Sequence, residues 1–172
     1  KRDKIVHYNG AIKTAEQTYY CSGSTAAQML YQVASVLASV NSYDKRLLVL
    51  SDAATWINNW INGCGIKDKE AILCWYHLRE RCRELVGEAF CNKEDRDEVR
   101  KKLLKYLWRG NSDKAIAYLK KLITDAEDGI SKLGIKSLSG IEAIKNYLIK
   151  RRAYLADYQA RYKNIGLWTK KV

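Results

Sequence analysis

The chain has 172 residues, of which 47% are hydrophobic and 29% are charged, and these proportions exclude a disordered chain. Lys and Arg number 31 against 19 Asp and Glu, which gives a formal net charge of +12. Nucleic acid is the usual polyanion that so basic a domain attracts, although a charged surface also serves solubility. No apolar run is long enough to span a bilayer, and no signal peptide opens the chain, which begins with the charged residues Lys1-Arg2-Asp3-Lys4. We therefore expect a cytoplasmic protein without a membrane partner.

The cysteines are predicted to be reduced thiols. Their number is odd, and a chain of this length does not need disulfides to stabilise its core. They include no Cys-x-x-Cys pair, so the sequence does not support a structural zinc site. The five are Cys21, Cys64, Cys74, Cys82 and Cys91.

The first part of the chain is predicted to mix short strands with helix. Residues 4–8 are a strand candidate, and Asn9-Gly10 is a hairpin turn signal because both residues tolerate positive φ. Residues 18–21 are rich in β-forming residues and are the expected returning strand. Ser24 is then a candidate cap for a helix whose apolar residues recur at helical spacing.

Strand and helix are predicted to alternate in the next part. Residues 47–50 form a continuous apolar run, which suits a strand buried on both faces. Residues 56–61 carry the apolar stripe of a short helix, and residues 71–74 are a second short strand followed by a further helix. This alternation is typical of α/β proteins, in which sites lie at the carboxyl ends of strands. Asp52 and Cys74 both stand at such ends.

From Asn92 onward the pattern predicts helices alone. Asn92 is a plausible N-cap, and acidic residues follow it in the first turn. Ser139 and Glu142 fit a capping box that would open the last helix. We expect that helix to run on through Tyr158 and Tyr162.

Asp52 is a candidate metal ligand. A carboxylate just after a buried strand can bind a hard cation such as Mg²⁺, which needs one or two carboxylates together with substrate phosphates. The alternative is that Asp52 caps the helix that holds Trp56, and the two roles are compatible.

Cys74 and His77 place a thiol and an imidazole three residues apart, a spacing open to three interpretations. Metal binding would need two further ligands, for which Cys64 and Cys82 are weak candidates. Nucleophilic catalysis would need the pair within hydrogen-bond reach and a third orienting group. Packing of a buried cysteine beside a hydrogen-bonded histidine needs neither.

Two stretches carry these residues in a set order: Leu-Val-Leu-Ser-Asp52-Ala-Ala-Thr-Trp56-Ile, then Ile-Leu-Cys74-Trp-Tyr-His77-Leu. Together they resemble the middle of DDE transposases of the Mutator-like group and its bacterial insertion-sequence relatives. In that group the second catalytic Asp ends a strand, usually in an Asp-Gly-Ala-x-Trp-Ile run. A Cys/Asp-x-x-His motif follows on the next strand and helix, and a helical insertion then precedes the final catalytic Glu. The stretch from Tyr147 to Trp168 also looks like the lead-in to that Glu.

The resemblance implies an α/β fold that is helix-rich overall. Residues 1–91 would be a partial RNase H-like catalytic core, and residues 92–172 an all-α insertion with the lead-in to the final motif. Asp52 would be the second metal ligand, and Cys74 and His77 would support the active-site edge. The implied cofactor is a pair of Mg²⁺ or Mn²⁺ ions, about 4 Å apart, that activate the attacking oxygen and stabilise the leaving oxygen. The implied partners are DNA and a second transposase copy, at the nucleoid of a bacterial cell.

The chain departs from the family pattern at three places. Ala53 stands where the family usually has Gly, and neither Asp3 nor Asp44 matches the first catalytic Asp. The final Glu is expected just after Trp168, where the chain reads Thr-Lys-Lys-Val. We therefore expect an incomplete catalytic domain with little or no strand cleavage of its own. A truncated or domesticated DNA-binding regulator is the alternative, and a Cys/His hydrolase is a more distant one.

Basic and aromatic residues alternate near the end of the chain. Such residues can contact phosphates and stack on bases, or they can form a solvated basic face over an aromatic core stripe. A second basic stretch, Arg100-Lys101-Lys102 with Lys105, is open to the same two interpretations. The candidate DNA-binding residues at the end of the chain are Lys150, Arg151, Arg152, Arg161 and Lys163, interleaved with Tyr147, Tyr154, Tyr158 and Tyr162.

Overall fold

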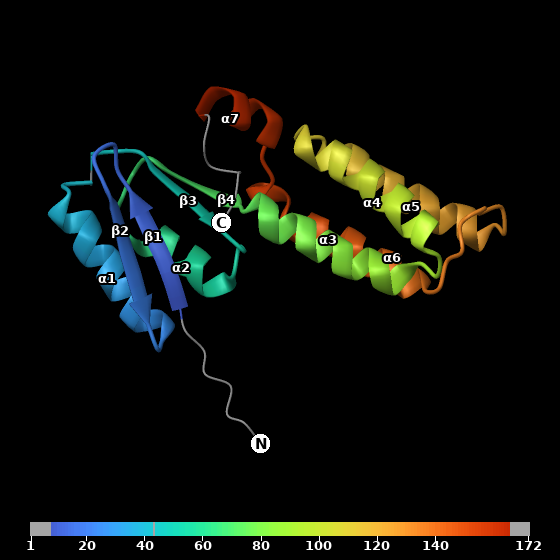
Figure 1. The fold of residues 1–172 in the computed structure, drawn as a ribbon, viewed down its shortest axis with the longest axis horizontal. Coiled ribbons are helices and arrows are strands. Elements are labelled where there is room, and N and C mark those ends of the chain that lie inside the picture. The colour runs from blue at the N-terminus through green and yellow to red at the C-terminus, as the bar shows by residue number, and fades with distance from the viewer. Residues whose placement is uncertain (1–7, 43, 166–172) are drawn as a thin grey trace, which may run out of the picture. The chain divides into compact units, whose positions relative to one another are not determined.

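The computed structural model describes residues 8–42 and 44–165. The chain divides into two compact units: unit 1 takes the described part of Lys1–Val49 with Ala54–Ala71, and unit 2 takes Leu50–Ala53 with the described part of Ile72–Val172. Helices dominate, and the strands of the described residues form two small sheets, so the predicted helix-rich α/β class is confirmed (Figure 1). No described helix combines the length and apolar character that crossing a membrane requires.

Unit 1 opens with an antiparallel hairpin of β1 (Tyr8–Lys13) and β2 (Thr18–Gly23). The predicted returning strand is confirmed, but the turn predicted at Asn9-Gly10 is wrong, because both residues pair inside β1. The turn instead lies between Thr14 and Gln17. The Thr14 hydroxyl accepts hydrogen bonds from the amides of Glu16 and Gln17, at 3.2 and 3.1 Å, and so makes a local turn without a glycine.

Helix α1 (Ala26–Ser39) packs against both strands of the hairpin (Figure 1). Its buried residues are Met29 and Leu37, eight positions apart and therefore on one helical face. The N-cap is Thr25, whose hydroxyl accepts a hydrogen bond from the Gln28 amide at 3.2 Å. The prediction that Ser24 is the cap was one residue off; the Ser24 hydroxyl bonds the Gln28 side chain instead.

A β-α-β segment follows, with β3 (Leu47–Ser51), α2 (Thr55–Gly63) and β4 (Lys69–Leu73). At one end the Leu47 amide donates to the Asp68 carbonyl at 2.8 Å, and at the other the Cys74 amide donates to the Ser51 carbonyl at 2.7 Å. The two strands therefore run parallel, and the predicted strand–helix–strand order is confirmed. The prediction that the first of them is buried on both faces is wrong: Leu50 is 38% exposed, and this sheet has two strands in the described residues.

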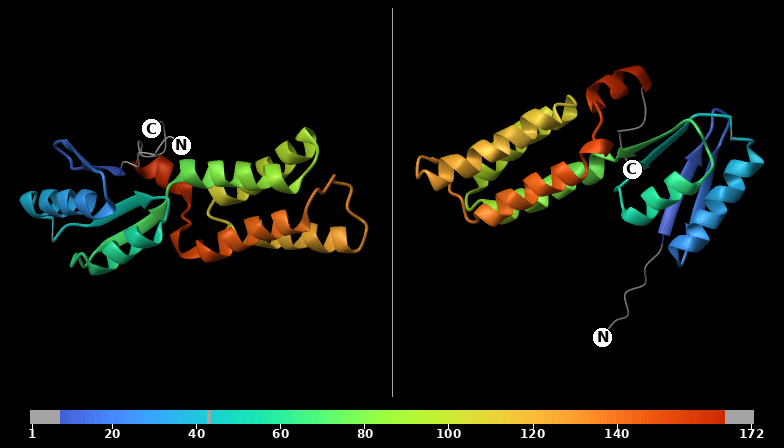
Figure 2. Two further views of the ribbon diagram at one scale, coloured as in Figure 1. Left: turned by 90° about the horizontal axis from the view of Figure 1, so that it is seen from below. Right: turned by 180° about the vertical axis from the view of Figure 1, so that it is seen from behind.

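Unit 2 is built on α3 (Trp75–Ala89), α4 (Lys93–Trp108), α5 (Ser112–Glu127) and α6 (Leu138–Lys150). Each helix packs on the next and α6 returns to α3, which closes a four-helix bundle (Figure 2). The side chains inside it recur every three or four residues, as one face of a helix requires. At most 1% of each is exposed for Leu78, Cys82, Val86, Val99, Leu103, Leu107, Leu119, Ile141, Ile144 and Leu148.

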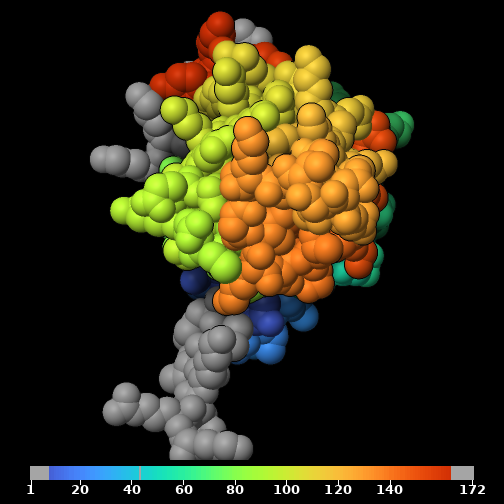
Figure 3. All heavy atoms as spheres, turned by 90° about the vertical axis from the view of Figure 1, so that its right-hand side faces the viewer, coloured from blue at the N-terminus to red at the C-terminus, as the bar shows by residue number. Residues whose placement is uncertain are grey.

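The connections at one end of the bundle are hydrogen-bonded to each other. The Cys91 amide donates to the Gly134 carbonyl and the Lys136 amide donates to the Ala89 carbonyl, at 2.8 and 2.9 Å. In Figure 3, which views the molecule from this side, the connection between α5 and α6 lies beside the start of α4. The described cysteines are all free thiols, and burial raises the pKa of the Cys82 thiol to about 12.

Two predictions about the last helix are wrong. The N-cap of α6 is Ser137, whose hydroxyl accepts from the Gly140 amide at 3.1 Å, while Glu142 pairs with Lys145 instead of forming a capping box. The helix also ends at Lys150. A 3₁₀ turn η1 (Arg152–Tyr154) and a separate helix α7 (Tyr158–Ile165) follow it.

The predicted domain boundary between residues 91 and 92 falls inside unit 2, in the connection between α3 and α4. The structure shows that α3 packs with the later helices of the bundle.

Candidate functional site

The candidate site lies where β3 and β4 end, in unit 2. Asp52 follows the last residue of β3 and is exposed, and Cys74 follows the last residue of β4 and is half-buried. The 2.7 Å hydrogen bond from the Cys74 amide to the Ser51 carbonyl joins the two strand ends. The structure therefore brings Asp52 and Cys74 to the same edge of the sheet, as the sequence predicts.

The backbone after Asp52 turns sharply at Ala53. Its φ is +57°, in the left-handed region that glycine adopts freely and that costs other residues about 1–2 kcal/mol. The Ala53 amide donates to the Ser51 hydroxyl at 3.0 Å, and the Ala53 side chain is buried. The position at which the resembling transposases usually carry Gly is thus one whose conformation favours Gly.

The alternative that Asp52 occupies the N-cap position of α2 is wrong. That helix begins at Thr55, and Ala54 stands in the cap position without a side-chain cap bond. Asp52 lies two residues before that cap position.

Cys74 and His77 lie at the start of α3. Cys74 occupies the N-cap position, and its carbonyl accepts the first helical hydrogen bond from the Leu78 amide at 3.0 Å. His77 is exposed in the first turn, with its ring edge-on to Tyr76 at 5.6 Å between centroids. No hydrogen bond joins the thiol and the imidazole of this described pair, so the geometry needed for a cysteine nucleophile is not formed.

Charged and aromatic residues that the sequence did not place beside Asp52 lie near it. Tyr147 on α6 is half-buried, and burial is the main cause of its raised pKa; the Asp52 carboxylate raises it further. The guanidinium groups of Arg151 and Arg81 act in the opposite direction, and that of Arg151 lies over the Tyr147 ring at 4.9 Å. The Arg151 Nε is buried and makes no hydrogen bond. Arg81 follows His77 by four residues, so the two side chains lie on the same face of α3. This spacing was the sequence signal that could have placed Arg81 near the site.

Asp52 is the hard oxygen ligand that this edge offers to a metal ion. Within residues 8–42 and 44–165, no three His, Cys, Asp or Glu side chains lie close enough together to hold one. A pair of catalytic ions needs more carboxylates than this. The described residues alone do not form such a site, and we derive no catalytic step from them.

The predicted DNA-binding residues are spread over three elements. Lys150 is exposed at the end of α6, and Arg151 follows it against Tyr147. Arg152 forms an ion pair with Asp113 at 2.7 Å. Arg161 is half-buried and Lys163 is exposed, both on α7. The structure does not bring these five together as one helical face, because the chain breaks the helix between residues 150 and 158.

One aromatic residue of this part, Tyr158, belongs to the core. Tyr158 is buried, donates its hydroxyl hydrogen to the Leu73 carbonyl at 2.7 Å, and packs on Trp75 and Trp108. Tyr162 also packs on Trp108, at 6.1 Å between ring centroids. For Tyr158 the core interpretation is thus confirmed over the base-stacking one.

The chain was also compared with known proteins. No family model matches it, and no curated protein or solved structure is significantly similar to it. The residues and geometry described above are therefore the basis for a functional proposal.

Proposed function

We propose that this chain is part of a DDE transposase, with β3, α2 and β4 drawn from an RNase H-like core and Asp52 serving as one catalytic metal ligand. The observation that carries the proposal is the joined pair of strand ends. Asp52 and Cys74 follow parallel strands linked by the bond between the Cys74 amide and the Ser51 carbonyl. The carboxyl edge of such strands is where α/β proteins place their sites.

Three further observations support the proposal. The left-handed backbone at Ala53 is the conformation expected of an Asp-Gly motif. The chain also keeps the family's order of strand and Asp52, helix, strand and Cys74, and then a series of helices. The net charge of +12 suits a partner as negative as DNA.

In this proposal Asp52 binds Mg²⁺ or Mn²⁺ together with DNA phosphates, since these ions accept one or two carboxylates and phosphate oxygens as ligands. Cys74 and His77 support the edge of the site. DNA and a second transposase copy are the partners, at the nucleoid of a bacterial cell. Because the described residues supply only part of the metal site, we expect little or no strand cleavage by this chain alone.

A second candidate is a non-catalytic DNA-binding regulator. The observation that favours it is that two guanidinium groups, from Arg81 and Arg151, lie near Tyr147 together with the Asp52 carboxylate. The guanidinium groups lower the pKa of Tyr147, and the carboxylate raises it. A carboxylate in such surroundings can be balanced by cations of the protein itself, without a metal ion. This candidate requires DNA binding but no metal.

The two candidates differ in the effect of metal on DNA binding. Fluorescence anisotropy with a short labelled duplex is measured in EDTA and in Mn²⁺. We expect Mn²⁺ to tighten binding of the wild type and Asp52→Ala to lose that increase, because the ligand that joins metal to protein is gone. Asp128→Ala is the control: it removes an exposed carboxylate at the end of α5 and should keep the Mn²⁺-dependent increase in DNA affinity.

An Asp52→Ala variant that retains the full Mn²⁺-dependent increase in DNA affinity would contradict the metal role of Asp52. The non-catalytic DNA-binding regulator would then be the remaining candidate. A wild-type chain that binds no duplex would contradict both candidates. Where binding occurs, its log–log dependence on salt should have a slope of about −0.9 per phosphate contacted.

A further inference from the structure

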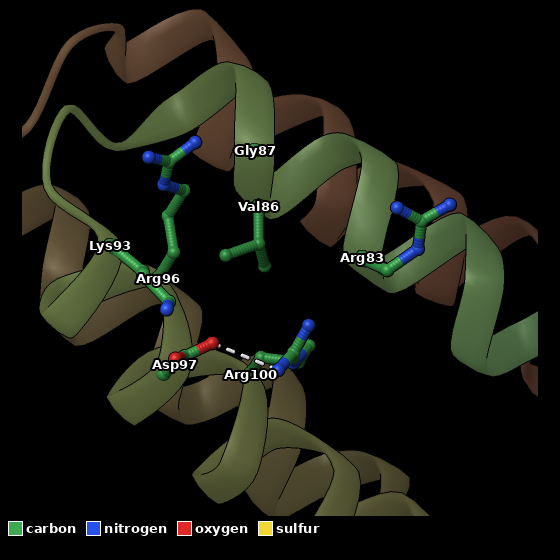
Figure 4. A pocket seen from close by; sticks show the side chains of 7 residues that line it. All are labelled: Arg83, Val86, Gly87, Lys93, Arg96, Asp97 and Arg100. Carbon is green, nitrogen blue, oxygen red and sulfur yellow. Dashed lines mark hydrogen bonds and ion pairs between the residues drawn. The ribbon is translucent and has the colours of Figure 1, made fainter.

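An open pocket of about 410 Å³ lies between α3 and α4, away from the candidate site. Figure 4 shows Arg83 on α3 and three cations along α4, with Val86 directed into the space between the two helices. The three cations of α4 are Lys93, Arg96 and Arg100. We propose that this pocket binds consecutive phosphates of a nucleic-acid backbone. The inference rests on the proposed DNA-binding function and names the surface that would carry it.

The pocket has more positive than negative charge. Arg83 pairs with Glu80 at 2.9 Å, and Arg100 pairs with Asp97 at 2.8 Å. Arg96 donates its Nε hydrogen to the Asn92 carbonyl at 3.1 Å, a bond that positions the guanidinium without neutralising it. The balance is four cations against two carboxylates, so the pocket attracts an anion.

Gly87 lines the pocket. It lies in the interior of α3, where glycine weakens a helix relative to alanine. A Cβ at Gly87 would meet nothing within 4 Å, so close packing does not require glycine there. Gly140 on α6 is different, because its Cβ would lie 2.9 Å from Ala89. Position 87 therefore has room for a larger side chain beside the cations.

The length of the cationic row indicates a chain of phosphates. Lys93 and Arg100 are seven residues apart, about 10 Å along a helix that rises about 1.5 Å per residue. One DNA strand places a phosphate about every 3.4 Å along its axis, so about three phosphates span the same length. A single free phosphate would engage only part of the row. Arginine side chains suit this ligand because they bind phosphate oxygens in pairs.

The test is to fill the pocket with a negative charge. Gly87→Glu introduces a carboxylate where there is room for it, and DNA binding is measured by anisotropy between about 50 and 200 mM salt. We expect affinity near 100 mM salt to fall about tenfold and the magnitude of the log–log slope to fall by about 1, as for the loss of one phosphate contact.

Two variants at the same position separate charge from bulk. Gly87→Gln has nearly the size of Gly87→Glu without its charge, and should weaken binding less. Gly87→Ala leaves the pocket open and should bind as the wild type does. Arg96→Gln tests the same surface without adding bulk and should also lower the slope by about 1. Thermal unfolding of each variant establishes that the fold is kept.

The outcomes distinguish this inference from the proposed function. If the wild type binds duplex DNA and both Gly87→Glu and Arg96→Gln keep its affinity and slope, the pocket assignment is overturned and the proposed function stands. If the wild type binds no DNA, both are overturned. If inorganic phosphate protects the wild type but not Gly87→Glu from thermal unfolding, while DNA affinity is equal in the two, the pocket takes a free anion and the nucleic-acid assignment is wrong.

Discussion

The two units of the chain bury their side chains to very different degrees. Unit 2 has a continuous core in which residues such as Leu103 and Leu148 are fully buried, whereas unit 1 buries a small set that includes Met29 and Leu37. A two-stranded sheet is marginal without a helix or further strands to cover it. The candidate site residues Asp52, Cys74 and His77 all belong to unit 2. The site is thus attached to the unit that supplies the larger share of the stability.

The largest predicted effect comes from the bundle core. Leu148→Ala should lower the free energy of unfolding by about 2–5 kcal/mol, because it removes a fully buried side chain and leaves a cavity. Urea denaturation measures the change. Leu37→Ala in α1 is the matched change in unit 1, and hydrogen exchange should then show loss of protection in that unit while the bundle amides stay protected. Equal loss of protection in both units would contradict the comparison.

A smaller effect is predicted at the contact between α3 and α6. Gly140→Ala should destabilise the bundle by about 1–3 kcal/mol, because the added Cβ would lie 2.9 Å from the Ala89 Cα. Gly87→Ala is the control within the same bundle. Its Cβ meets open space, so it should raise stability by up to about 1 kcal/mol. Thermal unfolding should therefore shift in opposite directions for the two variants, and a shift in the same direction would contradict the packing described.

Tyr158→Phe tests how α7 is held to the end of β4. The variant loses the hydrogen bond to the Leu73 carbonyl, which should cost about 1 kcal/mol in the free energy of unfolding. Tyr106→Phe is the control, because it removes the hydroxyl of another ring of the bundle, which packs edge-on to Tyr118. If Tyr158→Phe is as stable as the wild type, that hydrogen bond does not hold α7.

The same residue gives a pH prediction. Burial is the main cause that raises the pKa of the Tyr158 hydroxyl above its usual value near 10. Above that pH the unfolded chain releases a proton that the folded chain retains, so stability falls as the pH rises through this range. Tyr158→Phe should make the alkaline loss of stability less steep than in the wild type.

The smallest predicted effect lies at the site itself. Ala53→Gly should raise stability by up to about 1 kcal/mol, because glycine adopts the positive φ without strain, although glycine also gives the unfolded chain more freedom. Ala54→Gly is the matched control at φ −62°, where no such relief is available and stability should fall. Equal effects of the two changes in chemical denaturation would contradict the left-handed turn after Asp52.

Local sequence patterns predicted the elements whose signals are local. The apolar run of β3, the stripe of α2 and the helical repeats of the bundle all follow from spacing along the chain. The position of the hairpin turn was not predicted, because the Thr14 hydroxyl forms the turn and no glycine marks it in the sequence. The cap of α6 was misplaced by two residues because Ser137 and Ser139 are both suitable caps, and only the geometry distinguishes them.

The candidate site was predictable to the extent that it depends on strand ends. Asp52 and Cys74 follow consecutive parallel strands, so their proximity follows from topology. The nearness of Tyr147 and Arg151 depends on α6 packing against α3, a contact between residues far apart in sequence. The pocket beside Gly87 likewise depends on how α3 and α4 lie together, which residue spacing within either helix does not reveal.

The proposed divalent-ion site lies at the carboxyl ends of β3 and β4 and uses Asp52 as a ligand. Mn²⁺ is paramagnetic, so titrating it into the isotope-labelled chain bound to duplex DNA broadens the amide signals nearest the ion. We expect broadening centred on Asp52, Ala53 and Cys74 that disappears in Asp52→Asn. Broadening that is absent there, or that is unchanged in Asp52→Asn, would contradict the proposed site.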